Sequence, residues 1–129
     1  MGVCTLITIL RLTQHEPTEK QVKALKDAFG DDINIINYLE YIKSGEEVVE
    51  LVEKYSADVV EVVLPLNLLN EVVNLLKDRV IIIRAIMERY QKLRGFGIIF
   101  EFSHYEIIEE VKVVTRPLLP NTLSLSHSN

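Results

Sequence analysis

The chain of 129 residues is long enough for one domain with a single buried core. Hydrophobic residues make up 48% and charged residues 26%, a balance typical of globular rather than disordered proteins. No apolar run approaches the roughly 20 residues that a membrane-spanning helix needs. A net charge of −5 argues against bulk binding to nucleic acid, which requires a basic face.

Other compositional features bear on the environment of the protein. Cys4 is the single cysteine, so no intramolecular disulfide is possible and a reducing, cytoplasmic compartment is expected. Because Cys4 borders an apolar strand, we expect a buried and unreactive thiol. We expect no cleaved secretory signal, since no basic segment precedes the apolar run. Abundant Ile, Val, Leu, Glu and Lys without Trp favour a heat-adapted source.

The first two-thirds of the chain alternates between predicted strands and helices. Apolar, mostly β-branched runs predict four buried strands, at residues 4–12, 33–39, 59–64 and 80–87. The first helix is expected to begin at the capping box Thr18–Gln21, just after Pro17, and to stop at Gly30. Ser44–Glu47 predicts a second capping box, and Asn67 is expected to cap the third helix.

This alternation predicts an α/β fold with three βα units, right-handed crossovers and a mostly parallel sheet. Residues 97–102 and 111–115 are predicted as two more strands, forming an antiparallel pair at the sheet edge. A short helix at 105–111 is the alternative. We therefore expect a small Rossmann-like domain of three layers over residues 1–116, followed by a flexible tail at 117–129.

Polar residues occupy the loop where the first strand leads into the first helix, namely Thr13, Gln14 and His15. In open α/β sheets this is the usual place for a ligand. The helix N-terminus that follows offers backbone N–H groups to an anion, and His15 could bind phosphate or transfer a proton near neutral pH. The alternative for His15 is a loop histidine bonded to a backbone carbonyl. A flavodoxin-like strand order would bring Asn67 to the same place, as a ligand contact or only as a helix cap.

A second candidate feature is the segment that follows the fourth strand. It contains the only dense basic cluster of the sequence, with Arg84, Arg89, Lys92 and Arg94, and with Tyr90 among them. Arginines in such a place suit recognition of a phosphodiester. A solvated loop in which Glu88 pairs with these side chains explains the same residues, and both explanations stay open.

Several reaction classes lack their motifs. Neither G-x-G-x-x-G nor G-x-x-x-x-G-K-[ST] occurs, which argues against dinucleotide cofactors and P-loop chemistry. No acidic triplet follows the first strand, and no G-x-S-x-G elbow is present. His15, His104 and His127 have no metal-ligand spacing. We therefore expect neither a metal nor a cofactor.

The stretch Leu12–Gln21 resembles the opening of small uncharacterised phage, plasmid and archaeal-virus proteins, a strand followed by L-T-x-H-x-[A/P]-T-x-x-Q. It is also similar to the opening of small CRISPR-accessory proteins with a CARF-like Rossmann fold. Some of those proteins cleave cyclic oligoadenylate signals as dimers and without a metal. The resemblance covers about ten residues, and what it implies for this chain is carried by Thr13, His15 and Gln21.

Two hypotheses follow for the function. In the first, the domain binds a nucleotide or small phosphodiester. Thr13 and His15 would hold phosphate, and in a metal-independent cleavage of a cyclic oligonucleotide His15 would transfer a proton while Arg89 or Arg94 steadies the developing charge. In the second, the chain is a non-enzymatic interaction protein of a virus, plasmid or other mobile element of a thermophile. It would form a homodimer through the strands at 97–115. The residues leave open whether the protein is an enzyme.

Overall fold

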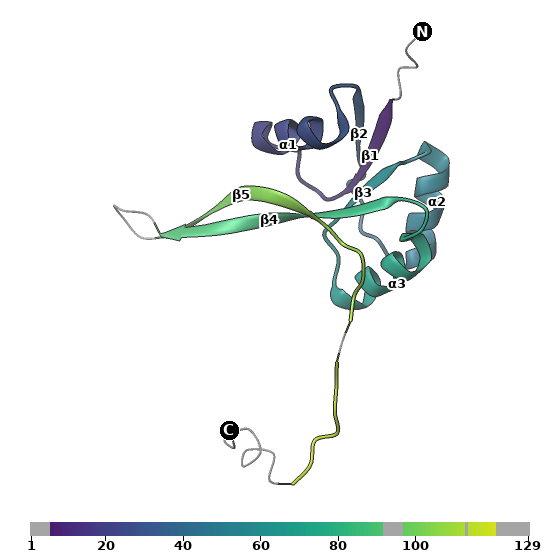
Figure 1. The fold of residues 1–129 in the computed structure, drawn as a ribbon, viewed down its shortest axis with the longest axis vertical. Coiled ribbons are helices and arrows are strands. Elements are labelled where there is room, and N and C mark those ends of the chain that lie inside the picture. The colour runs from purple at the N-terminus through teal and green to yellow at the C-terminus, as the bar shows by residue number, and fades with distance from the viewer. Residues whose placement is uncertain (1–5, 92–96, 113, 121–129) are drawn as a thin grey trace.

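The computed structural model describes residues 6–91, 97–112 and 114–120 (Figure 1). Cys4 and the role predicted for it lie outside these residues. The described elements are β1 (Ile7–Leu12), α1 (Glu19–Phe29), β2 (Ile33–Asn37), α2 (Gly45–Tyr55), β3 (Val59–Val62), α3 (Leu66–Leu76), β4 (Ile81–Gln91) and β5 (Ile98–Ile107). None of the described helices has the length and apolar character needed to cross a membrane.

The five strands form one sheet in the order β2-β1-β3-β4-β5. Strands β1 to β4 are parallel, and β5 pairs with β4 in the antiparallel sense. The apolar cluster of α1 lies on one face of the sheet and that of α2 and α3 on the other, which gives three layers. The predicted small Rossmann-like α/β class is confirmed, with the flavodoxin-like order that places a switch point between β1 and β3.

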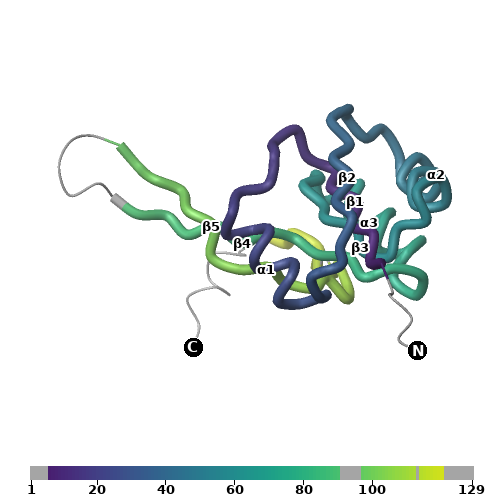
Figure 2. Tube along the Cα trace, turned by 90° about the horizontal axis from the view of Figure 1, so that it is seen from above, coloured from purple at the N-terminus to yellow at the C-terminus, as the bar shows by residue number. Residues whose placement is uncertain are grey.

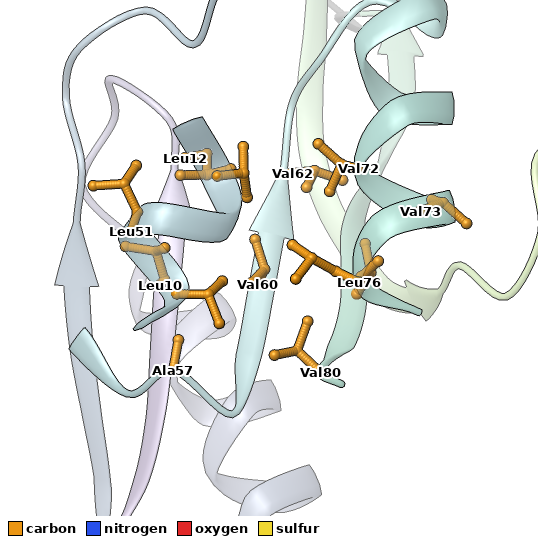
Figure 3. Close-up of a cluster of buried hydrophobic side chains, with 13 residues drawn as sticks. Leu10, Leu12, Leu51, Ala57, Val60, Val62, Val72, Val73, Leu76 and Val80 are labelled. Carbon is orange, nitrogen blue, oxygen red and sulfur yellow. The ribbon is translucent and has the colours of Figure 1, made fainter. Parts of the chain in front are cut away.

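The main core lies between the sheet and helices α2 and α3 (Figure 3). Leu10 of β1, Val60 of β3 and Leu76 of α3 are fully buried there, and Figure 3 shows their side chains in one cluster. A smaller apolar cluster on the opposite face joins Ile9 and Val59 to Leu25 of α1. Because neighbouring residues of a strand point to opposite faces, β1 and β3 supply both clusters.

Of the three predicted helix caps, the one of α1 is confirmed, the one of α2 is confirmed in part and the one of α3 is wrong. In α1 the backbone N–H of Gln21 donates to Thr18 Oγ1 at 3.2 Å. The backbone N–H of Thr18 donates to the Gln21 side-chain oxygen Oε1 at 3.0 Å, which completes the capping box. Ser44 caps α2, but the Glu47 carboxylate accepts from the Lys43 amide at 2.8 Å and so leaves the box half made. The prediction that Asn67 caps α3 is wrong.

The start of α3 follows from Pro65. Pro65 has φ −62° and ψ 157°, which places the first helical residue directly after it, so Asn67 is already the second residue of the helix. Proline has its ring-fixed φ and no N–H to satisfy, and it is therefore common at helix starts. As a result, α3 begins without any side-chain cap.

The C-terminal strands differ from the prediction. β4 continues through 88–91, where a loop was expected, and β5 runs through 103–107 as a strand, so the alternative helix at 105–111 is wrong. The described residues within 111–115 are not in a strand, and the antiparallel pair is β4 with β5. The register from Ile83–Ile107 to Gln91–Ile98 explains this, because backbone pairing with β4 extends the strand across polar residues.

The core makes a direct prediction about stability. Leu76→Ala should lower the free energy of unfolding by about 2–5 kcal/mol, because it removes a fully buried side chain and leaves a cavity. Leu66→Ala, in the same helix but 56% exposed, is the matched control and should change it by less than about 1 kcal/mol. Urea denaturation measures both values. Equal effects of the two substitutions would contradict the packing described here.

Candidate ligand-binding site

A pocket of about 250 Å³ opens at the carboxyl ends of β1 and β3. Its walls are the last residue of β1 with the loop that follows it (residues 12–15), residues 40–42 after β2 and residues 63–65 after β3. We call it the switch-point pocket, because the strand order reverses between β1 and β3. The predicted residues Thr13, Gln14 and His15 all line this pocket.

The His15 side chain is exposed at the pocket while its backbone is held in place. The His15 carbonyl accepts from Arg11 Nη1 at 2.8 Å, and its amide donates to Thr13 Oγ1 at 3.4 Å. No residue in the described ranges hydrogen-bonds to the imidazole, so the carbonyl-bonded histidine considered above is not what the structure contains. The ring is available to a ligand.

Beneath this loop lies a buried ion pair between neighbouring strands. Arg11 of β1 and Glu61 of β3 are register partners and are 2% and 1% exposed. Arg11 Nε lies 2.9 Å from Glu61 Oε1, and Nη2 lies 3.2 Å from Oε2. Two parallel N–H···O contacts of this kind are the strongest geometry for an arginine–carboxylate pair.

The same ion pair gathers side chains from three further elements. Arg11 Nη1 also donates to Asn37 Oδ1 of β2 at 2.9 Å, and Nη2 contacts Gln21 Oε1 of α1 at 3.4 Å. The Tyr105 hydroxyl of β5 donates to Glu61 Oε1 at 2.8 Å. No buried side-chain polar atom within the described part of the chain lacks a partner. The network therefore fixes the loop that carries His15 relative to the sheet and α1.

Arg11 and Glu61 were not predicted as site residues, although the sequence contains a signal for them. Each is the single charged residue of an otherwise apolar strand, and both strands were predicted to be buried on both faces. A charge is expensive to bury unless it is paired. Glu61 is the only acidic residue in a buried strand next to β1, and the strand register places it opposite Arg11.

The uncapped start of α3 is the second polar feature of the pocket. Pro65, the N-cap residue, lines the pocket, and no side chain accepts from the first-turn amides. Thr18 and Ser44, in contrast, cap α1 and α2. Free amides and the helix dipole make such a terminus attractive to an anion. The exposed Asn67 lies in the first turn of this helix but does not line the pocket.

Two further residues that were not predicted from the sequence also line the pocket. Tyr41 is 79% exposed and Glu40 is exposed beside it, both in the loop after β2. Glu40 Oε2 accepts from the Tyr38 hydroxyl at 3.3 Å. An exposed aromatic ring and a carboxylate therefore line the same pocket as His15.

The predicted arginines lie elsewhere. Arg84 lines a different cavity, of about 490 Å³, and pairs with Glu106 at 3.4 Å. Arg89 lies on β4 opposite Phe100, well along the β4–β5 hairpin, and Arg94 lies outside the described residues.

Glu88, the predicted partner of these arginines, instead accepts hydrogen bonds from the hydroxyls of Tyr90 and Ser103. Those hydrogen bonds lower the pKa of Glu88. No Lys or Arg among the described residues lines the switch-point pocket.

The described residues contain no group of three or more His, Cys, Asp or Glu side chains placed to hold a metal ion. The chemistry available at the pocket is therefore an imidazole, hydroxyl groups, an amide, a carboxylate and the amides of a helix start.

The buried ion pair makes a prediction about stability. Arg11→Met should lower the free energy of unfolding by about 3–5 kcal/mol, because it leaves Glu61 buried without its partner. The double variant Arg11→Met with Glu61→Leu should regain at least half of that loss. Arg79→Met, which breaks an exposed pair with Glu53, is the control and should change it by less than about 1 kcal/mol. A mild effect of Arg11→Met in urea denaturation would contradict the structural role of the pair.

Tyr105 makes a prediction about pH. Burial, followed by the charge of Glu61 and the hydrogen bond to it, raises the pKa of Tyr105 far above its ordinary value of about 10. The folded protein thus holds this proton more tightly than the unfolded chain. The stabilisation is complete below about pH 10 and is lost as the pH rises above it. Urea denaturation from about pH 9 to pH 11 should show a smaller decline for Tyr105→Phe than for the exposed control Tyr41→Phe. Equal declines would contradict the assignment.

Comparison with known proteins assigns no family to this chain. No protein-family model matches it, and neither a curated protein nor a solved structure gives a significant match. The resemblance of Leu12–Gln21 to viral and CRISPR-accessory proteins therefore stays a prediction. The pocket has to be interpreted from its own geometry and chemistry.

Proposed function

We propose that the switch-point pocket binds a nucleotide or small phosphodiester. The observation that carries this proposal is the meeting of an exposed His15 with the uncapped start of α3 in one pocket. Phosphate oxygens are the ligand group that suits both, since helix-start amides and an imidazole N–H are donors. Thr13, which also lines the pocket, adds a hydroxyl donor.

The lining residues that follow β2 suit the rest of a nucleotide. Tyr41 presents an exposed ring on which a base can stack, and base–aromatic stacking tolerates any base. Glu40 follows β2, and in dinucleotide-binding folds an acidic residue about 20 residues after the phosphate loop accepts from a ribose hydroxyl. Phosphate near His15 and α3 would thus place sugar and base toward Glu40 and Tyr41.

The size and charge of the pocket favour binding of a ligand over its cleavage. A volume of about 250 Å³ is below the roughly 300–1,000 Å³ of most ligand pockets, so a ligand of mononucleotide size would keep one end in solvent. Cleavage of a cyclic oligonucleotide by His15 would need a group to offset developing charge. The first-turn amides of α3 are donors that could do so, since Arg84 and Arg89 lie on other surfaces. Binding is therefore the function proposed, with cleavage as an additional activity to assay.

Calorimetric titration with AMP, cyclic di-AMP, cyclic tetra-adenylate and inorganic phosphate tests the proposal. His15→Ala should weaken binding of the best ligand about tenfold or more, the value of a hydrogen bond to a charged group. His104→Ala removes an exposed histidine of β5, far from the pocket lining, and should leave the affinity unchanged. Product analysis of the same mixtures reports cleavage. No binding of any probe, or equal loss in both variants, would contradict the proposal.

Pro65→Asp separates stability from binding. An aspartate at the N-cap should accept from the first-turn amides and stabilise α3 by about 0.5–2 kcal/mol. The same carboxylate would occupy the anion site and repel phosphate, so nucleotide affinity should fall while the melting temperature rises. Pro65→Ala, which adds no cap and no charge, is the control. A rise in stability with unchanged affinity would remove α3 from the binding site.

A further inference from the structure

Strand β5 is an open edge of the sheet. It is the last strand in the order β2-β1-β3-β4-β5, and its only strand partner among the described residues is β4. In an antiparallel pair, every second residue of an edge strand points its backbone N–H and C=O away from the neighbouring strand. The outer side of β5 therefore presents backbone donors and acceptors that no described strand uses.

β5 also lacks the usual features by which proteins protect such an edge. Edge strands are commonly short, interrupted by proline or lined with lysine. β5 has ten residues and contains no Pro, Lys or Arg, whereas the opposite edge strand β2 has five residues. The one irregularity of the ladder lies between Ile86 and Met87, so the pairing of residues 83–86 with 104–107 is regular. Residues 104–107 thus form an open and regular edge.

A groove follows this part of the edge. It has a volume of about 380 Å³ and lies between α1, with Ala24 and Ala28, and the five consecutive residues 103–107 of β5. Figures 1 and 2 both show α1 beside β5, with the outer part of the β4–β5 hairpin reaching past it. We call it the α1–β5 groove. Its volume is within the roughly 300–1,000 Å³ that is typical of binding sites.

The α1–β5 groove runs along the main chain of β5 rather than over one face of the strand. Neighbouring residues of a strand point to opposite faces, so a pocket over one face would be lined by every second residue. Tyr105 lies on the α1 face, where it packs against the apolar cluster, whereas Glu106 pairs with Arg84 on the other face. Because both Tyr105 and Glu106 line the groove, it gives access to the backbone between them.

The other lining side chains are mostly apolar. Leu25 and Phe29 of α1 and Ile83 of β4 are among them, and no Lys or Arg of the described chain lines the groove. Its single acidic residue, Glu106, already pairs with Arg84. The groove therefore offers backbone hydrogen bonds on one side and apolar contacts on the other. An extended polypeptide segment satisfies both, with its main chain on the strand edge and alternate side chains in the apolar part.

Helix α1 limits which kind of strand can enter. It forms the second wall of the groove, and the ion pair of Lys20 with Glu101, at 2.8 Å, ties it to β5. A second copy of the domain would bring its own α1 along with its β5, and the two helices would compete for the space beside the joined edges. A single extended segment, such as a chain terminus or a loop, carries no such helix.

The described part of the C-terminal tail does not suit this edge either. Residues 114–120 include Pro117 and Pro120, which have no backbone N–H to donate. An uninterrupted segment from a partner protein has the required donors.

We propose that the α1–β5 groove binds an extended segment of a partner protein, which adds to β5 as a further strand of the sheet. Residues of the segment that lie opposite Tyr105 and Ile107 share the face of these two side chains and point to α1, so they should be apolar and uncharged. This inference is independent of the switch-point pocket and its ligand.

Selection from a displayed library of random peptides on the full chain tests the proposal. Enriched peptides should share apolar residues at alternate positions. In fluorescence anisotropy with a labelled enriched peptide, Ala28→Arg should weaken binding about tenfold or more, because the arginine fills the groove. Asn74→Arg adds the same side chain at an exposed position of α3 outside the groove and should leave the affinity unchanged. Circular dichroism checks that both variants are folded.

Methylation of the peptide backbone tests recognition of the main chain on the wild-type protein. Two peptides of the same sequence carry N-methyl groups on one or the other set of alternate residues, so their side chains are unchanged. The set whose N–H groups face β5 should lose affinity about tenfold or more, and the other set should bind as the parent peptide does.

Equal effects of the two methylated sets would contradict the addition of a strand. The absence of any enriched peptide, or equal binding to Ala28→Arg and the wild type, would overturn the proposal as well. A wild-type chain that sediments as a dimer, and that Ala28→Arg converts to a monomer, would assign the groove to a second copy instead.

Discussion

The polar end of this domain depends on one buried contact, the ion pair between Arg11 and Glu61 in adjacent parallel strands. Two charges with 2% exposed side chains are tolerated because their geometry is bidentate and the remaining donors and acceptors are filled. Arg11 supplies the donors for β2, α1 and the loop after β1, and Glu61 accepts from β5. On the α1 face of the sheet, one pair of side chains thus takes the place of an apolar core at the carboxyl end, while Leu12 and Val62 stay in the apolar core on the other face.

The buried ion pair also determines how the loop above it is held. An apolar core end would be covered by apolar loop residues, whereas a guanidinium can hold a loop by its backbone carbonyl. The loop of Thr13, Gln14 and His15 is therefore held by the His15 carbonyl, and its three side chains line the pocket. The absence of a cap on α3 adds donors at the same edge. Among the described residues, both features leave hydrogen-bonding groups at the switch point without a side-chain partner, and such groups favour the binding of a ligand.

The features that depend on local sequence patterns could be predicted from the sequence. Apolar runs located β1 to β4, the capping box Thr18–Gln21 located the start of α1, and strand–helix alternation gave the parallel sheet. Predictions from local sequence were wrong or incomplete where the structure depends on pairing with segments that are distant in the sequence. β5 extends through His104 and Tyr105 because β4 pairs with it, and Tyr41 reaches the pocket only because β2 lies next to β1. Arg11 and Glu61 were recognisable as charges in buried runs, but pairing them required the register.

The central claim is that the switch-point pocket takes an anionic ligand between His15 and the start of α3. The most direct measurement is an amide and imidazole NMR titration of the full chain with AMP and with cyclic tetra-adenylate. The account predicts saturable shifts at the His15 ring and at the amides of residues 66–68, with Arg84 and Arg89 unaffected. Shifts confined to the β4–β5 hairpin, or no shifts at all, would contradict it.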